Sequence, residues 1–147
     1  MASISGGEKL EAYLRETSAK VSKPGTLRVG FLEGATYPDG TPVATVAAIQ
    51  NFGAPAMGIP PRPFFTDMID KKASSWPAAI GGLLKDNDMD ATKALVQTGQ
   101  AISGQLRQSI VDTNSPPLSP KTIARKGFEK PLVDTGHMLN SIDSEVS

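Results

Sequence analysis

The sequence contains no cysteine and a single histidine, His137, among its 147 residues. The missing cysteines exclude a disulfide framework, a zinc site with thiolate ligands, a cysteine nucleophile and an iron–sulfur cluster. One histidine also excludes a histidine-rich metal site. We therefore expect neither a metal nor a cofactor.

An excess of charge and a long apolar run are missing as well. The 15 basic and 15 acidic side chains give a formal net charge of zero, whereas a dedicated nucleic-acid binder uses many lysine and arginine contacts to phosphate. No stretch approaches the roughly 18 apolar residues of a membrane span, and residues 1–7 lack the basic segment and apolar run of a secretory signal. We expect a protein made in the cytosol, with no membrane partner.

The chain does have the length for one hydrophobic core. Chains near 150 residues bury roughly two-thirds of their unfolded surface, and a second full domain does not fit. We therefore expect a single domain over residues 1–147. Eight of the 12 prolines fall in two segments, which we predict to be assembly loops over residues 54–63 and 113–131.

The apolar pattern predicts several helices and two short strands. Alternation over residues 26–33 predicts a strand, and residues 144–147 are expected to form a second strand at the end of the chain. Because two such strands can pair, the expected class is α+β, a small antiparallel sheet packed with several helices and long proline-rich loops. Helical spacing predicts helices over residues 8–21, 42–52, 63–84 with a break at Pro77, from Asp88 or Asp90 through Ile110, and 135–142.

The first proline-rich segment is predicted to be a loop of fixed shape, since its prolines deny both a helix and a central strand. A stiff loop with an arginine and flanking aromatics suits a protein interface, because little entropy is lost on binding. Ordinary packing of Phe64 or Phe65 in the core, and of Phe52 in the last turn of its helix, is the alternative. The candidate contact residues here are Phe52, Pro61, Arg62, Pro63 and Phe64.

The second proline-rich segment carries a local basic cluster, Lys121, Arg125, Lys126 and Lys130, with few acidic residues nearby. Charges on a loop can reach a partner without disturbing the core, so these residues are candidates for contact with an acidic partner surface or with passing DNA. The alternative interpretations are a loop that is merely solvated and a DNA-binding module.

Asp134 lies in the string Leu-Val-Asp-Thr-Gly, which is typical of aspartic proteases, where two such loops share one proton between carboxylates. Proteases follow the glycine with a small residue, whereas here His137 follows and a helical run begins. We therefore interpret Asp134 as a structural cap for the free amides of that helix. No enzymatic activity is expected, and a protease that uses Asp134 stays the less favoured alternative.

Two strings carry a resemblance to a known family. The first is a helix ending in an aromatic-Gly pair, Ala48–Gly53, followed by Pro61-Arg62-Pro63-Phe64-Phe65. The second is Pro117–Gly127 followed by Lys130–Gly136, Leu139 and Ser141-Ile142. Over residues 27–146 the sequence resembles the small neck and tail-completion proteins of long-tailed bacteriophages, which include tail-terminator-like components.

This resemblance implies an α+β subunit of a homo-oligomeric ring, expected to be a hexamer, in the neck or tail of the virion. The ring would join the tail tube protein to the head–tail connector, and the genomic DNA would pass through its lumen without sequence-specific binding. It would be assembled in the host cytoplasm. A head-closure protein or a minor tail protein is the alternative within the same class.

Overall fold

The computed structural model describes residues 6–23, 25–113 and 136–147. Within these ranges the chain has an α+β fold, as predicted. The helices and strands are α1 (Gly7–Val21), β1 (Leu27–Phe31), α2 (Val43–Phe52), α3 (Phe64–Lys72), α4 (Trp76–Asp86), α5 (Ala91–Asp112), α7 (His137–Asn140) and β2 (Ile142–Val146). Two short 3₁₀ turns, Pro55–Met57 and Ala73–Ser75, lie between α2 and α3 and between α3 and α4.

The sheet joins the two ends of the fold. β1 pairs antiparallel with β2, so that Leu27 lies opposite Val146 and Phe31 opposite Ile142. Thr26 and Ser147 extend the ladder, since each backbone N–H donates to the other residue's carbonyl, at 2.8 and 3.0 Å. The predicted pairing of the two strands is therefore confirmed, although β2 begins two residues earlier than predicted.

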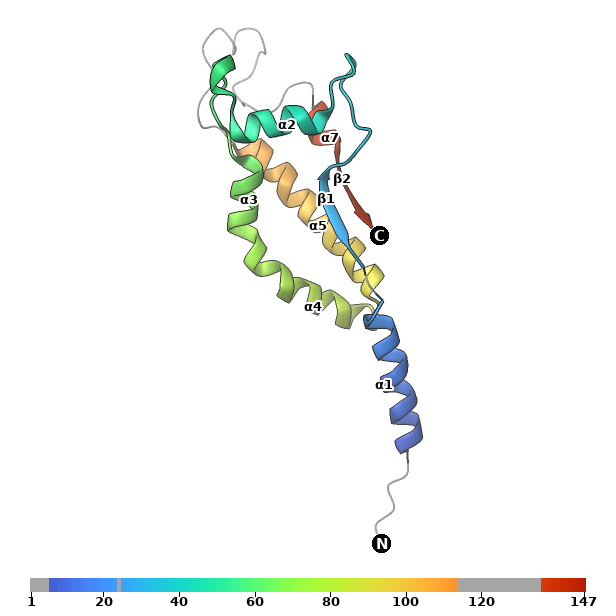
Figure 1. The fold of residues 1–147 in the computed structure, drawn as a ribbon. Coiled ribbons are helices and arrows are strands. Elements are labelled where there is room, and N and C mark those ends of the chain that lie inside the picture. The colour runs from blue at the N-terminus through green and yellow to red at the C-terminus, as the bar shows by residue number, and fades with distance from the viewer. Residues whose placement is uncertain (1–5, 24, 114–135) are drawn as a thin grey trace.

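The long helix α5 is the centre of the domain, and the sheet, α3 and α4 all pack against it (Figure 1). The sheet approaches α5 closely at Gly99, where a Cβ atom would lie 2.8 Å from Leu27 Cδ1 and from Ser144 Oγ. Asp90 caps the start of α5, because its Oδ1 accepts a hydrogen bond from the Lys93 N–H at 3.1 Å. Of the two predicted caps, Asp90 is the one used.

The core lies between α5 and the elements around it. Phe64 is 1% exposed, and its ring meets the ring of Phe31 edge-on, with centroids 6.3 Å apart. The core side chains come from α2, α3, α5, α7 and β2, and they are Val43, Ala47, Phe64, Met68, Ile102, Leu106, Ile110, Met138 and Ile142.

Two of the predicted helix boundaries were wrong. The helical stretch after Phe64 breaks at Ala73–Ser75 and not at Pro77, because proline in the first turn of a helix loses no hydrogen bond. The last helix begins at His137, after Gly136, whose φ of 72° is left-handed. Asp134 lies outside the described residues, so its role as a cap stays a prediction.

α1 is set apart from the rest of the domain. It was predicted from its apolar spacing, and it points away from the packed body (Figure 1). None of its residues is buried, although one of its faces carries large apolar side chains. No helix within the described ranges is both long enough and apolar enough to cross a membrane.

Candidate assembly surface

The loop between α2 and α3 has a shape fixed by its own hydrogen bonds. The backbone N–H of Ala54 donates to the Ile59 carbonyl at 2.8 Å, and the Ile59 N–H donates back to Ala54 at 3.1 Å. Inside this bridge the Met57 N–H also donates to the Ala54 carbonyl, at 2.9 Å. The part of the loop from Ala54 to Ile59 is therefore held by its own backbone hydrogen bonds, and the role of residues 54–63 in assembly stays a prediction.

Gly53 lets the two limbs of this loop come together. It ends α2 with φ at 76°, which is strained for any residue with a side chain. A Cβ atom here would lie 2.8 Å from the Pro61 nitrogen and 3.0 Å from the Ile59 oxygen. Both the conformation and the close approach therefore require glycine.

Asn51 ties the loop to the start of α3. It is 4% exposed, and its Oδ1 accepts hydrogen bonds from the backbone N–H groups of Phe65 at 3.0 Å and Thr66 at 3.2 Å. These are free amides of the first turn of α3, so a side chain from α2 caps a different helix. No role was predicted for Asn51. The available signal was its spacing, since Asn51 continues the buried face of α2 begun by Val43 and Ala47.

Arg62 fixes the return limb of the loop. Its backbone N–H donates to the Gln50 carbonyl at 2.7 Å, and its Nη1 lies 3.4 Å from Gln50 Oε1. The residue is 7% exposed, and this burial lowers the pKa of the guanidinium below its usual range. Arg62 was predicted to contact a neighbour. That role stays a prediction, and in the single chain the residue is buried and lies beside Gln50 of α2.

The structure divides the aromatic residues between the core and the surface, and this division differs from the sequence prediction. Phe64 was a candidate contact residue, but it is a core side chain, because α3 turns it toward α5. Phe52 is 71% exposed, so the alternative that it packs within its helix is wrong. Met57, at the tip of the loop, is 70% exposed and was missed. Of the two prolines, Pro61 is exposed and Pro63 is half-buried.

A shallow groove lies beside Phe52, where β1 meets α2 and the start of α3. Its volume is about 370 Å³, and no charged residue lines it among the described ones. Ala44 and Ala48 form its α2 wall, and both are exposed. We call this the α2 groove, lined by Val29, Phe31, Ala44, Ala48, Phe52 and Phe65 among others.

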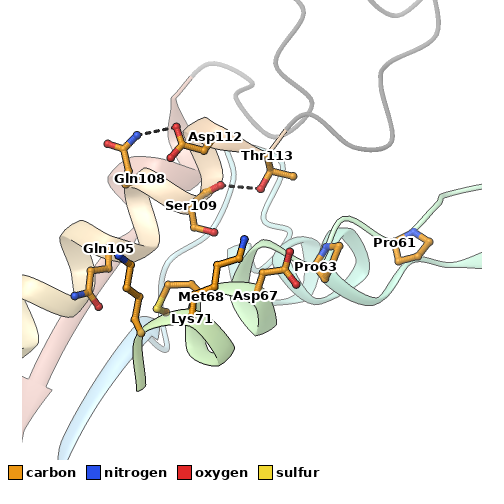
Figure 2. Close-up of a pocket in the computed structure, with 11 residues that line it drawn as sticks. Pro61, Pro63, Asp67, Met68, Lys71, Gln105, Gln108, Ser109, Asp112 and Thr113 are labelled. Atoms are coloured by element: carbon orange, nitrogen blue, oxygen red, sulfur yellow. Dashed lines mark hydrogen bonds between the residues drawn. The ribbon is translucent and has the colours of Figure 1, made fainter. Parts of the chain in front are cut away.

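A second groove, of about 540 Å³, separates α3 from the C-terminal end of α5, and its lining mixes polar and charged side chains with Pro61, Pro63 and Met68 (Figure 2). Its polar groups are largely engaged with the chain itself. Ser109 Oγ donates to the Phe64 carbonyl at 2.6 Å, and Gln108 donates to Asp112 at 2.8 Å. Among the described residues, no group of three or more acidic or histidine side chains could hold a metal ion.

The remaining predicted residues divide into two groups. His137 Nε2 lies 2.7 Å from the Thr36 carbonyl oxygen, and its ring packs on Tyr37 with centroids 4.8 Å apart, so this histidine joins α7 to the loop after β1. The basic residues of the second proline-rich segment lie outside the described residues, and their role stays a prediction. They are Lys121, Arg125, Lys126 and Lys130.

Comparison with known proteins yields no match, whether the chain is compared with family models, with curated proteins or with solved structures. The resemblance to phage neck and tail-completion proteins therefore stays a prediction that depends on the two sequence strings. The function has to be argued from the described surfaces.

Proposed function

We propose that this chain is a non-enzymatic virion protein that forms a homo-oligomeric ring at the head-proximal end of a phage tail, between the tail tube and the head–tail connector. One structural observation carries most of this proposal. Phe52 and Met57 are each about 70% exposed. Phe52 is the last residue of α2, and Met57 lies on the loop that follows, whose backbone is held by its own hydrogen bonds.

Large apolar side chains on a rigid support are suited to binding another protein. Aromatic residues and methionine are enriched in protein interfaces, and a contact made by a pre-ordered loop loses less conformational entropy than one made by a flexible loop. The neutral net charge also supports binding to another protein, because affinity must then come from shape and apolar contact more than from charge.

The proposal joins these surfaces to the sequence resemblance. The strings that resemble the phage proteins include Phe52-Gly53 and Pro61–Phe65, and these residues build the two ends of the fixed loop. In a ring, one patch of each subunit docks on a different patch of the next, and the contacts close on themselves. A rigid loop with an apolar tip is a suitable part of such a contact.

The test is to express the chain alone and with the tail tube subunits of the same genome, then to measure particle masses and to image the products by electron microscopy. The wild-type chain should form rings that attach to one end of a tube. The double variant F52S/M57S should lose the rings or their attachment. The variant V96S changes a residue that is 43% exposed on α5, far from this loop in the chain, and should behave as wild type.

A wild-type chain that stays monomeric, with and without tube subunits, would contradict the proposal. Rings that attach to the connector and not to the tube would favour the head-closure alternative. Rings along the tail would favour a minor tail protein.

A further inference from the structure

α1 has an apolar stripe whose large side chains stay exposed in the described chain. Leu10 is 59% exposed, Tyr13 63%, Leu14 55% and Val21 39%. At 3.6 residues per turn these four side chains lie within an arc of about 100°. Arg15 pairs with Glu11 on the opposite side of the helix, whereas Lys20, which pairs with Glu16, lies at the edge of the stripe beside Tyr13.

A helix of 15 residues is only marginally stable in water without a packing partner. The chain's own body contacts one edge of the stripe and buries none of it. Tyr13 and Thr17 line a small cavity against the turn between α4 and α5, and no residue of α1 is buried there. A stripe of this width at helical spacing is the pattern of a helix that packs against an apolar surface.

The C-terminal end of α1 is separated from the packed body by a short stretch of chain. The Ser22 N–H donates to the Ser18 carbonyl at 2.8 Å, which continues the helical hydrogen bonds to residue 22. Gly25 is packed so closely that a Cβ atom would lie 2.8 Å from Leu95 Cδ1 of α5. Only residues 23 and 24 separate Ser22 from Gly25 in the sequence, so this end of α1 stays close to α5.

The α2 groove is apolar and lined by small side chains, so it is complementary to the apolar stripe of α1. Its α2 wall consists of small side chains, Ala44 and Ala48, with exposed Phe52 one turn further along. Small residues allow a second helix to approach closely, and leucines from that helix can fill the space above them. The lengths also correspond, since Leu10 to Val21 spans about 16 Å along α1 and Ala44 to Phe52 about 12 Å along α2.

The two surfaces lie at opposite ends of the molecule (Figure 1). A contact between α1 of one copy and the α2 groove of the next is therefore head-to-tail. Contacts of this kind build rings where the rotation closes, whereas identical patches that meet across a two-fold axis stop at a dimer. Both surfaces are also uncharged, so neither brings an unpaired charge into the contact.

We infer that α1 is an assembly arm, and that its apolar stripe docks in the α2 groove of a second copy of this chain. The inference rests on the proposed function in one respect only, that the chain assembles with itself. It adds the two surfaces that meet and the head-to-tail direction of the contact.

Three variants test the arm, with self-association measured by native mass spectrometry and light scattering. The arm variant is L10E/L14E, and the groove variant is A48E, which adds a charge at an exposed alanine. Each should raise the Kd of self-association by about 100-fold, because a charge buried in an apolar contact has no partner. The control A12E/A19E adds two glutamates to the charged side of the same helix and should change the Kd by less than about two-fold.

A mixture of the arm variant and the groove variant gives the sharpest result. The arm variant keeps an intact groove, and the groove variant keeps an intact arm. The mixture should therefore form a 1:1 heterodimer that neither variant forms with itself. Circular dichroism of each variant should show the wild-type helix content, since all the altered residues are exposed.

Three outcomes would overturn the inference. If L10E/L14E disrupts assembly while A48E does not, the arm pairs with something other than the α2 groove. If the wild type forms rings that neither variant weakens, the arm has no role and the proposed function stands. If the wild type is monomeric at every concentration, with and without tube subunits, both the arm and the proposed function fail.

Discussion

The loop between α2 and α3 and the helix α1 both display large apolar side chains, but they are supported in opposite ways. The loop is held at both ends, by Asn51 at the start of α3 and by the close approach at Gly53. Among the described residues, α1 is held by its own backbone hydrogen bonds and two surface ion pairs, and it shares a small cavity with the turn before α5. The loop is a part of the folded domain, and α1 is an appendage to it.

This difference separates residues that stabilise the subunit from residues that are available to another molecule. Phe64 and Phe52 show it with the same side chain, one 1% exposed and the other 71% exposed. Substitution of a buried residue such as Phe64 should lower the free energy of unfolding of a single chain. Substitution of an exposed residue such as Phe52 should leave that free energy nearly unchanged and should weaken assembly.

The largest expected effect is the loss of the Phe64 side chain. F64A should lower the free energy of unfolding by about 4 kcal/mol, because it leaves a cavity between α3 and α5. F52A should change it by less than about 0.5 kcal/mol, since that ring is exposed. Urea unfolding of the monomeric protein measures both values. Equal losses for the two variants would contradict the assignment of Phe64 to the core.

The next effect should come from Gly53. G53A should cost about 3 kcal/mol, because the new Cβ atom needs a left-handed φ and also meets the Pro61 nitrogen at 2.8 Å. Gly58 is the matched control, with φ at 67° and nothing within 4 Å of a Cβ atom. G58A should therefore cost only about 1 kcal/mol. If the two variants lose the same stability, the close approach at Gly53 contributes nothing.

A smaller loss is expected at Asn51. N51A should cost about 2 kcal/mol, because two amides at the start of α3 lose their acceptor in a buried position. Hydrogen exchange should show the Phe65 and Thr66 amides becoming faster. N140A, at an exposed position on α7, should lose less than about 0.5 kcal/mol. Unchanged exchange at both amides would show that Asn51 does not cap α3.

The smallest effect on the subunit should come from removing α1 altogether. A chain without residues 1–21 should keep the wild-type midpoint of thermal unfolding within about 2 °C when both chains are monomeric, since α1 buries none of its residues. Hydrogen exchange of the full-length chain should find the α1 amides fast in the monomer and protected after assembly. A fall of about 10 °C would show that α1 packs on its own body.

Much of the fold could be predicted from local sequence pattern. Periodicity placed α1, β1, α2 and α5, because each has an apolar face repeated over several turns or alternations. The break at Ala73–Ser75 could not be placed, since proline is compatible with the first turn of a helix and so marks its start as readily as its end.

The candidate surface was harder to predict, because it depends on which of several similar side chains turns inward. Phe52, Phe64 and Phe65 are alike in chemistry, and only the packing of α3 on α5 decides that Phe64 enters the core. The buried roles of Asn51 and Arg62 depend on hydrogen bonds across the loop, 14 and 12 residues apart in the chain. No local pattern reports such contacts.

The most direct test of the account is the mass of the wild-type protein in solution, measured across concentration and with tail tube subunits present. The account predicts a discrete closed oligomer whose mass is a whole multiple of 15.4 kDa. A single species of 15.4 kDa under every condition would contradict it.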